Sequence, residues 1–380
     1  MTTPILPGAT LGILGSGQLG RMFAQAAARL GYRVHVYSPE TDSPTGQVAD
    51  RETIAPYDDV EALAKFAQSV DVVTLEFENV PTIATETVRQ HVPVRPSGNV
   101  LHIAQNRLRE KRFLQDTGIA CAPFTAVYSP DDLLRAVEDI GLPAVLKTSD
   151  SGYDGKGQVM IRSADEIEAA WQNVGACPSV LEGFVEFERE LSVIVARTPS
   201  GETAIQGPIA NDHAHHILDV SMFPLPELEP HAAEAQSIAR KIAEAFELEG
   251  IVCVEFFLTV GGQLLVNEIA PRPHNSGHLT IEASYTSQFE RQVRAICDLP
   301  LGSTDPISPA AMVNLLGDIW ENGEPDWSAA LADPRLRLHL YGKGEARPGR
   351  KMGHLTVLAE TANAAADRAR TARERLRRRK

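Results

Sequence analysis

The segment from Ile251 to His278 constrains the fold most, because it holds two β-rich runs around a pair of glycines. The runs are IVCVEFFLTV and QLLVNEIA, and the dipeptide Gly261-Gly262 lies between them. Such a pair favours a two-residue hairpin turn of type I′, in which both central residues need positive φ. The sequence therefore predicts an antiparallel hairpin in which Val260 faces Gln263.

That register brings two carboxylates together. Counting away from the turn on both strands places Glu255 directly opposite Glu268. Opposed Cβ atoms lie about 4.5–5.5 Å apart, and two carboxylates at that distance repel each other. A cation between them removes the repulsion, and carboxylates acting with phosphate oxygens are typical Mg²⁺ ligands. Two solvent-exposed glutamates on a half-buried hairpin are the other explanation.

A dense group of polar side chains follows the second run and favours a functional site over a plain turn. The group comprises Arg272, His274, Asn275, Ser276 and His278.

Composition and charge bound the class of protein. The chain has 380 residues, 43% of them hydrophobic, which predicts two or three globular domains. The net charge of −14 argues against general binding of nucleic acid. The basic C-terminal run ARTARERLRRRK is best explained as the solvated end of a helix.

The four cysteines, at positions 121, 177, 253 and 297, have neither metal-ligand nor redox spacing. The sequence shows no secretory signal pattern and no run of about 18 apolar residues, so the cytoplasm is the expected compartment, with no membrane partner.

The N-terminal stretch predicts strand, glycine turn, helix and strand. Gly15, Gly17 and Gly20 form G-x-G-x-x-G at the start of the helix, and Glu40 lies twenty residues further on. This pattern suits a dinucleotide phosphate at a helix N-terminus. Glycines that only permit close packing of strand and helix explain it equally well.

The strand VDVVTLEFENVP ends in Glu76, Glu78 and Asn79. Ligands of open α/β sheets collect beyond the carboxyl ends of the strands. Glu76 is therefore a ligand candidate, and an ordinary charged residue at a strand end is the alternative.

Residues 103–118 predict a helix that ends at Gly118. Lys147 then ends a strand, and SDSGYDGKGQ follows it. This glycine-rich stretch is not a Walker A loop, because Lys156 is followed by glycine. It predicts a hairpin loop whose N–H groups close over phosphates, with Lys147 offsetting their charge; a mobile surface hairpin with a chance lysine is the alternative.

Two further stretches suggest ligand contacts with low specificity. The link Glu182–Val185 offers backbone groups to an adenine edge, and Glu190 is placed to accept from ribose hydroxyls. The loop KGEARPGRKM joins two predicted strands and gathers Arg347, Arg350 and Lys351, which suit a phosphate monoester. A solvated basic loop is the alternative.

In this order, the segments LGSGQLGRM, TLEFENVP, GYDGKGQ, NEIAPRPHNSGH and RPGRKMGHL resemble the ATP-grasp superfamily. Within it they are most similar to the N5-carboxyaminoimidazole ribonucleotide synthase family, over about residues 12 to 355. The resemblance implies a mixed α/β and α+β fold. It places a Rossmann-like pre-ATP-grasp domain at 1–105, a small lid domain at 106–195 and a mixed-sheet ATP-grasp core with the substrate-phosphate loop at 196–380.

The resemblance also assigns roles to residues. ATP would contact Arg107, Lys147, Gly152, Tyr153, Asp154, Gly155, Lys156, Gly157, Gln158, Glu182, Gly183, Phe184, Val185, Glu190, His213, Asn267 and Glu268. Magnesium, or manganese, would bind Glu255 and Glu268. The ribonucleotide would contact Gln18, Glu76, Asn275, Ser276, Arg347, Arg350 and Lys351, so the first glycine turn would not hold NAD. Tyr153, Asp154, Lys156, Arg272 and His274 would face the reacting centre.

The implied activity is that of an ATP-dependent ligase of purine biosynthesis, a homodimer with a small-molecule substrate. ATP and bicarbonate would form carboxyphosphate, which carboxylates the exocyclic amine of 5-aminoimidazole ribonucleotide, with Asp154 or His274 as the base. Some departures from the family pattern stand out. Lys156 stands where some members carry Arg, Leu279 stands where some carry Trp, and Ala270 stands where many ATP-grasp enzymes have a metal-binding Asn. Alternation in an unbroken strand points Asn267 away from Glu268.

Three other functions remain open at this stage. The chain could be a different ATP-grasp ligase, such as a formate-using transformylase or a biotin carboxylase. It could be an NAD-dependent dehydrogenase built on its first 40 residues, although that leaves the glutamate pair unexplained. It could also be a nucleotide sensor that binds ATP without turnover.

Overall fold

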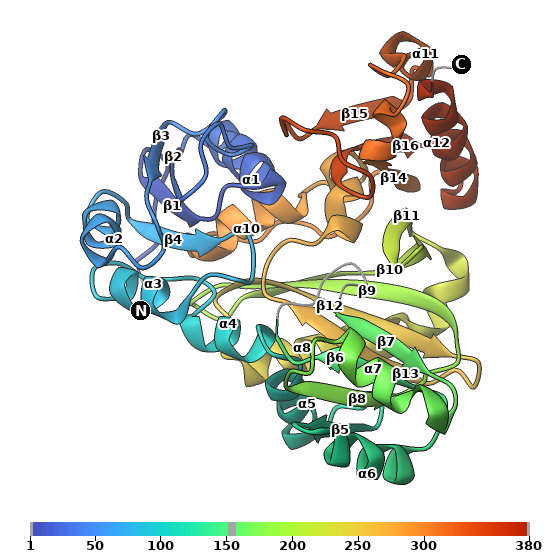
Figure 1. The fold of residues 1–380 in the computed structure, drawn as a ribbon. Coiled ribbons are helices and arrows are strands. Elements are labelled where there is room, and N and C mark those ends of the chain that lie inside the picture. The colour runs from blue at the N-terminus through green and yellow to red at the C-terminus, as the bar shows by residue number, and fades with distance from the viewer. Residues whose placement is uncertain (1–2, 151–156, 378–380) are drawn as a thin grey trace.

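The computed structural model describes residues 3–150 and 157–377, which form three sheets (Figure 1). The first is a parallel sheet in the order β3-β2-β1-β4. Its strands are β1 (Thr10–Leu14), β2 (Arg33–Ser38), β3 (Arg51–Ile54) and β4 (Val72–Leu75). The helices that accompany it are α1 (Gln18–Arg29), α2 (Val60–Ala67), α3 (Thr82–Arg89) and α4 (Gly98–Ala104). The carboxyl ends of β1 and β4 open towards the rest of the molecule, where the predicted ligand residues lie.

The second sheet is antiparallel, in the order β5-β8-β6-β7. Its strands are β5 (Phe124–Val127), β6 (Ala144–Thr148), β7 (Gln158–Ile161) and β8 (Ser179–Gly183). α6 (Pro130–Ile140), η1 (Ala164–Glu166) and α7 (Ile167–Asn173) accompany this sheet, and α5 (Arg107–Asp116) leads into it. Leu146, Leu181 and Trp171 belong to the apolar core of this unit.

The third sheet has eight strands in the order β13-β12-β9-β10-β11-β14-β16-β15. The strands are β9 (Phe187–Arg197), β10 (Thr203–Ala214), β11 (Ile217–Phe223), β12 (Gly250–Thr259), β13 (Leu264–Ala270), β14 (Ala310–Leu316), β15 (Leu336–Leu340) and β16 (Lys351–Leu358). Every pairing is antiparallel, so the expected mixed sheet is wrong in this respect. The connections β9–β10, β10–β11 and β12–β13 are too short for the crossover that parallel strands need.

The remaining helices cover this large sheet. They are η2 (Pro226–Leu228), α8 (Glu229–Ala245), η3 (Asn275–Leu279), α9 (Thr280–Ala283), α10 (Gln288–Ile296), η4 (Gly317–Trp320), α11 (Trp327–Leu331) and α12 (Ala362–Leu376). None of the helices in the described part of the chain is long and apolar enough to cross a membrane.

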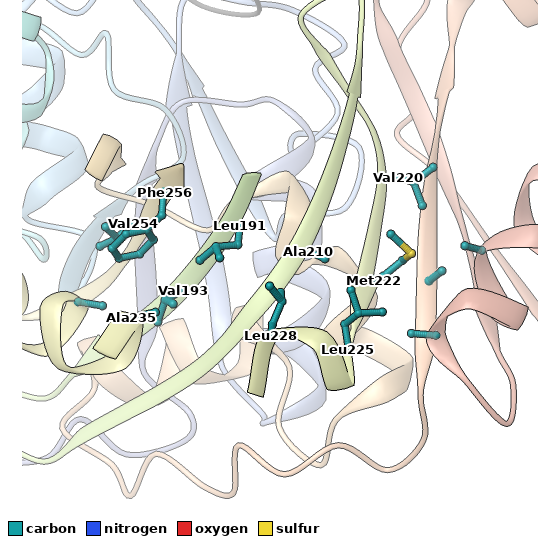
Figure 2. Packing of buried hydrophobic residues seen from close by; sticks show 14 of the residues in the cluster. Leu191, Val193, Ala210, Val220, Met222, Leu225, Leu228, Ala235, Val254 and Phe256 are labelled. Atoms are coloured by element: carbon teal, nitrogen blue, oxygen red, sulfur yellow. The ribbon is translucent and has the colours of Figure 1, made fainter. Parts of the chain in front are cut away.

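Strand β9 shows how the large sheet is buried on both faces. Leu191 and Val193 belong to the apolar cluster that includes α8 residues, whereas Ile194 belongs to the cluster on the opposite face, on the side of α10. Figure 2 shows Leu191 and Val193 packed near Ala235 and Leu228. Burying each large aliphatic side chain contributes about 1.5–3 kcal/mol. The sheet is thus a rigid support for the residues at its edge.

The hairpin β12–β13 confirms the predicted glutamate pair but not the predicted turn. Glu255 lies opposite Glu268, as expected. However, Thr259 N donates to Gln263 O at 2.9 Å, so the loop has three residues. Only Gly262 of the glycine pair has positive φ, at 78°, and a type I′ turn requires two such residues.

A bulge cancels the shift that the longer loop introduces. Glu255 pairs with Glu268, but the next residue, Phe256, pairs with Val266, which leaves Asn267 as the extra residue. The two deviations, one at the loop and one at Asn267, compensate by the time the chain reaches the glutamate pair.

Other predicted boundaries also move. The helix predicted over 103–118 is broken, and Asn106 Oδ1 caps the new start of α5 by accepting from Arg109 N at 3.0 Å. Gly118 follows the end of α5 with φ 63°, as predicted for a terminating glycine. After residue 280 the chain forms two short helices, α9 and α10, and Ser287 caps α10. The expected domain boundary at 195/196 lies inside β9.

Candidate active site

A single cleft of about 1870 Å³ lies where the three sheets meet. It is lined by the ends of β4 and β13, the hairpin β10–β11, the segment 182–190 and the loop 343–351. Most predicted site residues within the described chain reach it, namely Gln18, Glu76, Arg107, Lys147, Gln158, Glu182, Gly183, Phe184, Val185, Glu190, His213, Glu255, Asn267, Glu268, Arg272, His274, Asn275, Arg347, Arg350 and Lys351. The fold therefore gathers residues from positions 18 to 351 around one volume.

The predicted residues Gly152, Tyr153, Asp154, Gly155 and Lys156 lie outside the described residues. Gly157, the next residue, is not part of the cleft lining. It has φ 70°, and a Cβ there would lie 2.6 Å from Thr148 Oγ1. Both observations explain why glycine stands at this position.

The two carboxylates of the glutamate pair, which line the cleft, already have basic neighbours. Glu255 Oε1 lies 2.9 Å from His274 Nε2, and Glu268 Oε2 accepts from Arg107 at 3.3 Å. Burial opposes charge on both members of the first pair, but their mutual attraction outweighs it. The pKa of Glu255 is lowered and that of His274 is raised.

Asn267 lines the same cleft as Glu268. The expectation from strand alternation, which pointed it to the opposite face, is wrong because the bulge interrupts the alternation at this residue. Both side chains are therefore available to one ligand.

A buried ion cluster of Glu182, Lys147 and Lys111 lies beside the cleft. Glu182 Oε2 lies 3.0 Å from Lys147 Nζ and 3.4 Å from Lys111 Nζ. Burial would raise the pKa of Glu182, but the two ammonium groups lower it to about 2. Lys147 is thus held in place by a carboxylate that stays ionised. Sequence reasoning found Lys147 and Glu182 but missed Lys111.

The hairpin β10–β11 contributes three histidines to the cleft, at positions 213, 215 and 216. His213 Nδ1 lies 2.5 Å from Glu190 Oε2, and this contact raises the pKa of His213 against the opposing effect of burial. His215 and His216, with φ 52° and 64°, also line the cleft and were not predicted. Their left-handed backbone makes the tight turn that aims this hairpin into the cleft.

The first glycine turn is filled by a residue of the protein itself. A Cβ on Gly15 would lie 2.4 Å from Glu76 Cγ, and one on Gly17 would lie 2.9 Å from a carboxylate oxygen of Glu76. Glu76 accepts backbone hydrogen bonds from Gly17 and Gly20, while burial raises its pKa. An internal carboxylate therefore occupies the helix N-terminus where a dinucleotide phosphate would bind. This decides against the dehydrogenase alternative.

Arg272 joins the N-terminal sheet to the large sheet. It forms a fork with Glu78, in which Nη2 donates to Oε1 at 3.0 Å and Nε donates to Oε2. Burial opposes ionisation, but the pairing raises the pKa of Arg272 and lowers that of Glu78. Glu78 was noted at the strand end but not assigned a role.

The basic loop 343–351 closes the other end of the cleft. Arg350 donates to Glu345 O at 2.8 Å, and Gly349 N donates to Asp318 Oδ2 at 2.9 Å. A Cβ on Gly317 would lie 2.1 Å from Arg347 O, so only glycine lets the loop approach. These contacts hold the loop while its cations face the cleft.

Asn275 and Ser276, both predicted to contact the substrate, have different positions in the structure. Asn275 lines the cleft and donates to Asn314 Oδ1 at 3.1 Å. Ser276 is fully buried, outside the cleft lining, with its Oγ 2.7 Å from Ser192 Oγ and 2.8 Å from His274 Nδ1. The expected direct contact of Ser276 with substrate is therefore corrected: this side chain orients His274.

The lining residues that escaped prediction include Glu110, Lys343 and Glu40 as a member of this cleft. Glu110 lies beside Lys111 in the charged run RLREKR, where helical spacing alone does not reveal which charges are buried. Lys343 belongs to the quoted loop KGEARPGRKM, so its proximity to Arg347 was the available signal.

Comparison with known proteins identifies the three parts of the chain. The ribonucleotide synthetase preATP-grasp domain matches residues 8–105, the ATP-grasp domain residues 112–289, and the phosphoribosylaminoimidazole carboxylase C-terminal domain residues 310–368. The N5-carboxyaminoimidazole ribonucleotide synthase of Bacillus subtilis is 44% identical over 94% of this chain and 93% of its own length. That of Brucella melitensis is 46% identical, over 93% and 97%.

The chain belongs to the N5-carboxyaminoimidazole ribonucleotide synthase family. A solved ADP complex of an N5-carboxyaminoimidazole ribonucleotide synthetase superposes with a TM-score of 0.92 at 41% identity, covering 98% of both chains. The synthase of Aspergillus clavatus, in complex with ADP and 5-aminoimidazole ribonucleotide, superposes with a TM-score of 0.89 at 33% identity. It covers 97% of this chain and 98% of its own. The family assignment thus rests on sequence and on fold.

Proposed function

We propose that this chain is an ATP-dependent ligase that carboxylates the exocyclic amine of 5-aminoimidazole ribonucleotide in purine biosynthesis. Bicarbonate supplies the carboxyl group, and ADP and phosphate are released. One observation carries the proposal: the glutamate pair and the basic loop 343–351 line the same cleft. Relatives that share the whole chain are named for this reaction.

In the nucleotide half, Lys147 offsets phosphate charge, and the segment Glu182–Val185 contacts the adenine. Glu190 and His213 bind the ribose side, and Arg107 and Asn267 approach the phosphates. Phosphoryl transfer depends mainly on positioning and electrostatics, which a preformed set of charges supplies.

The residues present fit magnesium. Glu255 and Glu268 offer carboxylate oxygens from adjacent strands to one point of the cleft, and hard cations prefer such ligands. Among the described residues there is no cluster of three or more acidic, His or Cys side chains that could hold a metal. The two glutamates would therefore hold Mg²⁺ jointly with ATP phosphate oxygens. When bound, the ion would neutralise charge on the transferring phosphoryl group.

In the ribonucleotide half, Arg347, Arg350 and Lys351 bind the substrate phosphate. Gln18, Glu76 and Asn275 contact the rest of the substrate, and Ser276 acts only through His274.

Bicarbonate attacks the γ-phosphoryl group of ATP to form carboxyphosphate, which delivers CO₂ to the substrate amine. The paired carboxylates raise the pKa of Arg272 and of His274, which favours the cationic forms that suit the binding of an anionic intermediate. The base that takes the proton from the substrate amine is Asp154 or His274. We expect Asp154→Asn or His274→Asn to slow carboxylation, which a pre-steady-state assay measures separately from ATP cleavage. Near-normal turnover of both variants would refute this assignment.

We further propose three domains, at 1–105, 106–185 and 186–380, because β9 pairs with strands of the large sheet. A cytoplasmic homodimer is the assembly that the family resemblance implies. Light scattering after size exclusion tests it, since a monomer at working concentration would contradict it.

The decisive experiment measures ADP release with Mg²⁺, ATP and bicarbonate, with and without 5-aminoimidazole ribonucleotide. Strong stimulation by the ribonucleotide supports the proposal. Stimulation only by a different acceptor would retain the ATP-grasp chemistry but refute the substrate. ATP binding without any turnover would indicate a nucleotide sensor.

A further inference from the structure

Strand β13, which carries Glu268, is the edge strand of the large sheet. An edge strand presents main-chain groups that no neighbouring strand satisfies. Helix α5 lies against this strand, and two of its consecutive residues, Glu110 and Lys111, reach those groups. Neither residue has a role in the reaction proposed above.

The two contacts flank Glu268 on both sides. Lys111 Nζ donates to Asn267 O at 2.9 Å, and Glu110 Oε2 accepts from Ile269 N at 3.0 Å. Glu110 is 4% exposed and Lys111 is 1% exposed. Buried polar groups that lose their partners are costly, so these bonds hold the main chain firmly before and after the carboxylate.

Lys111 also connects this strand to the second sheet. Its Nζ lies 3.4 Å from Glu182 Oε2, and the same oxygen lies 3.0 Å from Lys147 Nζ. One ammonium group therefore links the bulge at Asn267 to the carboxylate that holds Lys147.

We propose that Glu110 and Lys111 form a main-chain clamp that positions Glu268 for the metal–nucleotide complex and aligns it with Lys147. They are positioning residues, since they act through Glu268 and Glu182. The inference rests on the proposed function only in assuming that Glu268 binds the metal of the nucleotide complex.

The test measures ADP binding by calorimetry, once with Mg²⁺ and once with EDTA. The ratio of the two affinities reports the contribution of the metal and is insensitive to general destabilisation. In Lys111→Met and Glu110→Leu we expect this ratio to fall about tenfold, equivalent to about 1.4 kcal/mol. Glu110→Gln should keep it, because the amide oxygen still accepts from Ile269 N.

Arg112→Met is the matched control, because Arg112 is the next residue of α5 and is exposed. Its ratio should equal that of the native protein. In steady state, KM for ATP should rise in Lys111→Met while KM for the ribonucleotide stays unchanged.

An unchanged Mg²⁺ ratio in Lys111→Met and Glu110→Leu would overturn the clamp. If Lys111→Met fails to fold by circular dichroism, the contrast between Glu110→Leu and Glu110→Gln decides. Native protein that binds ADP equally with and without Mg²⁺ would instead refute the proposed metal site, which keeps the two failures distinct.

Discussion

In the half of the cleft that we propose for the nucleotide, Glu182 contacts Lys111 and Lys147, and all three side chains are almost completely buried. In the half that we propose for the ribonucleotide, Arg347 contacts Glu345 at 3.2 Å while both side chains are more than 60% exposed. The first half pairs its charges inside the protein, and the second displays them at the surface of a loop.

The difference matters because buried and exposed ion pairs behave differently. Breaking a buried pair leaves an uncompensated charge at high cost, so the nucleotide half is fixed before ligand arrives. Exposed pairs contribute little and are screened by salt, so the cations of the loop can exchange a surface partner for a phosphate. We therefore expect ligand affinity to depend on salt more strongly in the ribonucleotide half.

The largest effect is expected in the nucleotide half. Glu268→Gln removes one of two carboxylates proposed to hold Mg²⁺ and should lower ribonucleotide-stimulated ADP release about 100-fold or more, because metal stabilisation of transition-state charge is worth several kcal/mol. A coupled assay of ADP measures it. Glu244→Gln, an exposed glutamate of α8, is the control. Near-native turnover of Glu268→Gln would remove this residue from the metal site.

A smaller effect is expected in the basic loop. Arg350→Gln should raise KM for the ribonucleotide about tenfold, or about 1.4 kcal/mol, with little change in kcat, because a charge-assisted phosphate contact is lost in ground and transition state alike. Steady-state kinetics at low and high salt measures it. The exposed Arg335→Gln serves as control. If KM for ATP and KM for the ribonucleotide depended equally on salt, the expected difference between the two halves of the cleft would be contradicted.

Behind the basic loop, the protein relies on uncharged histidines. His354 is fully buried, with Nδ1 2.9 Å from the hydroxyl of Tyr341, and its ring centroid lies 5.0 Å from that of buried His278. Burial, reinforced by the neighbouring His278 and His339, lowers the pKa of His354 well below 6.5. A lowered histidine pKa means that its stabilising effect is complete above about pH 6.5 and is lost as the pH falls below it.

We therefore expect the free energy of unfolding to fall by up to about 1.4 kcal/mol per pH unit below 6.5 for this one group. In His354→Gln that part of the slope should disappear. Urea unfolding between pH 6.5 and 5.5 measures it, with the exposed His91→Gln as control. Identical slopes in the native protein and His354→Gln would refute this origin of acid sensitivity.

The smallest effect concerns the basic C-terminal helix. Arg370 of α12 contacts Asp212 of β10 at 2.8 Å, and both side chains are more than a third exposed. Arg370→Gln should cost about 0.5 kcal/mol of stability, and less at high salt, because the pair is exposed to solvent. Thermal unfolding at two salt concentrations measures this loss of stability, with Arg375→Gln as the control. A loss above 2 kcal/mol would mean that this surface pair behaves like the buried cluster.

Patterns along the chain predicted much of this arrangement. Strand runs, the glycine turn and the basic loop identified the elements, and family resemblance identified the cleft. The pair Glu255 and Glu268 was predicted through a turn that does not form, since the longer loop and the bulge cancel at this position. Local periodicity describes pairing along one strand but carries no signal for a compensated bulge.

Other features depend on contacts between distant segments, which sequence patterns do not contain. In the sequence, Lys111 looks like one of several charged residues of an exposed helix. It is buried only because β8 and β13 lie against it in the fold. In the sequence, Ser276 looks like a hydrogen-bond donor to substrate beside Asn275, but the η3 turn points its side chain towards Ser192. The glycine turn could hold an outside phosphate until Glu76, from another strand, is seen to fill it.

The bulge at Asn267 resembles a dislocation in a crystal, because one extra residue in β13 shifts the strand pairing on one side of it. If the extra residue moved from Asn267 to the tip of the hairpin, the predicted two-residue turn would form and residues 264–267 would turn over to the opposite face. Glu255 and Glu268 would remain paired throughout, because they lie beyond the defect. The present register is held by the bond from Lys111 to the carbonyl of Asn267 and by the bond from Val266 N to Ala120 O. Contacts from neighbouring segments, together with the burial of Leu264 and Val266, thus select between two registers of the same strand.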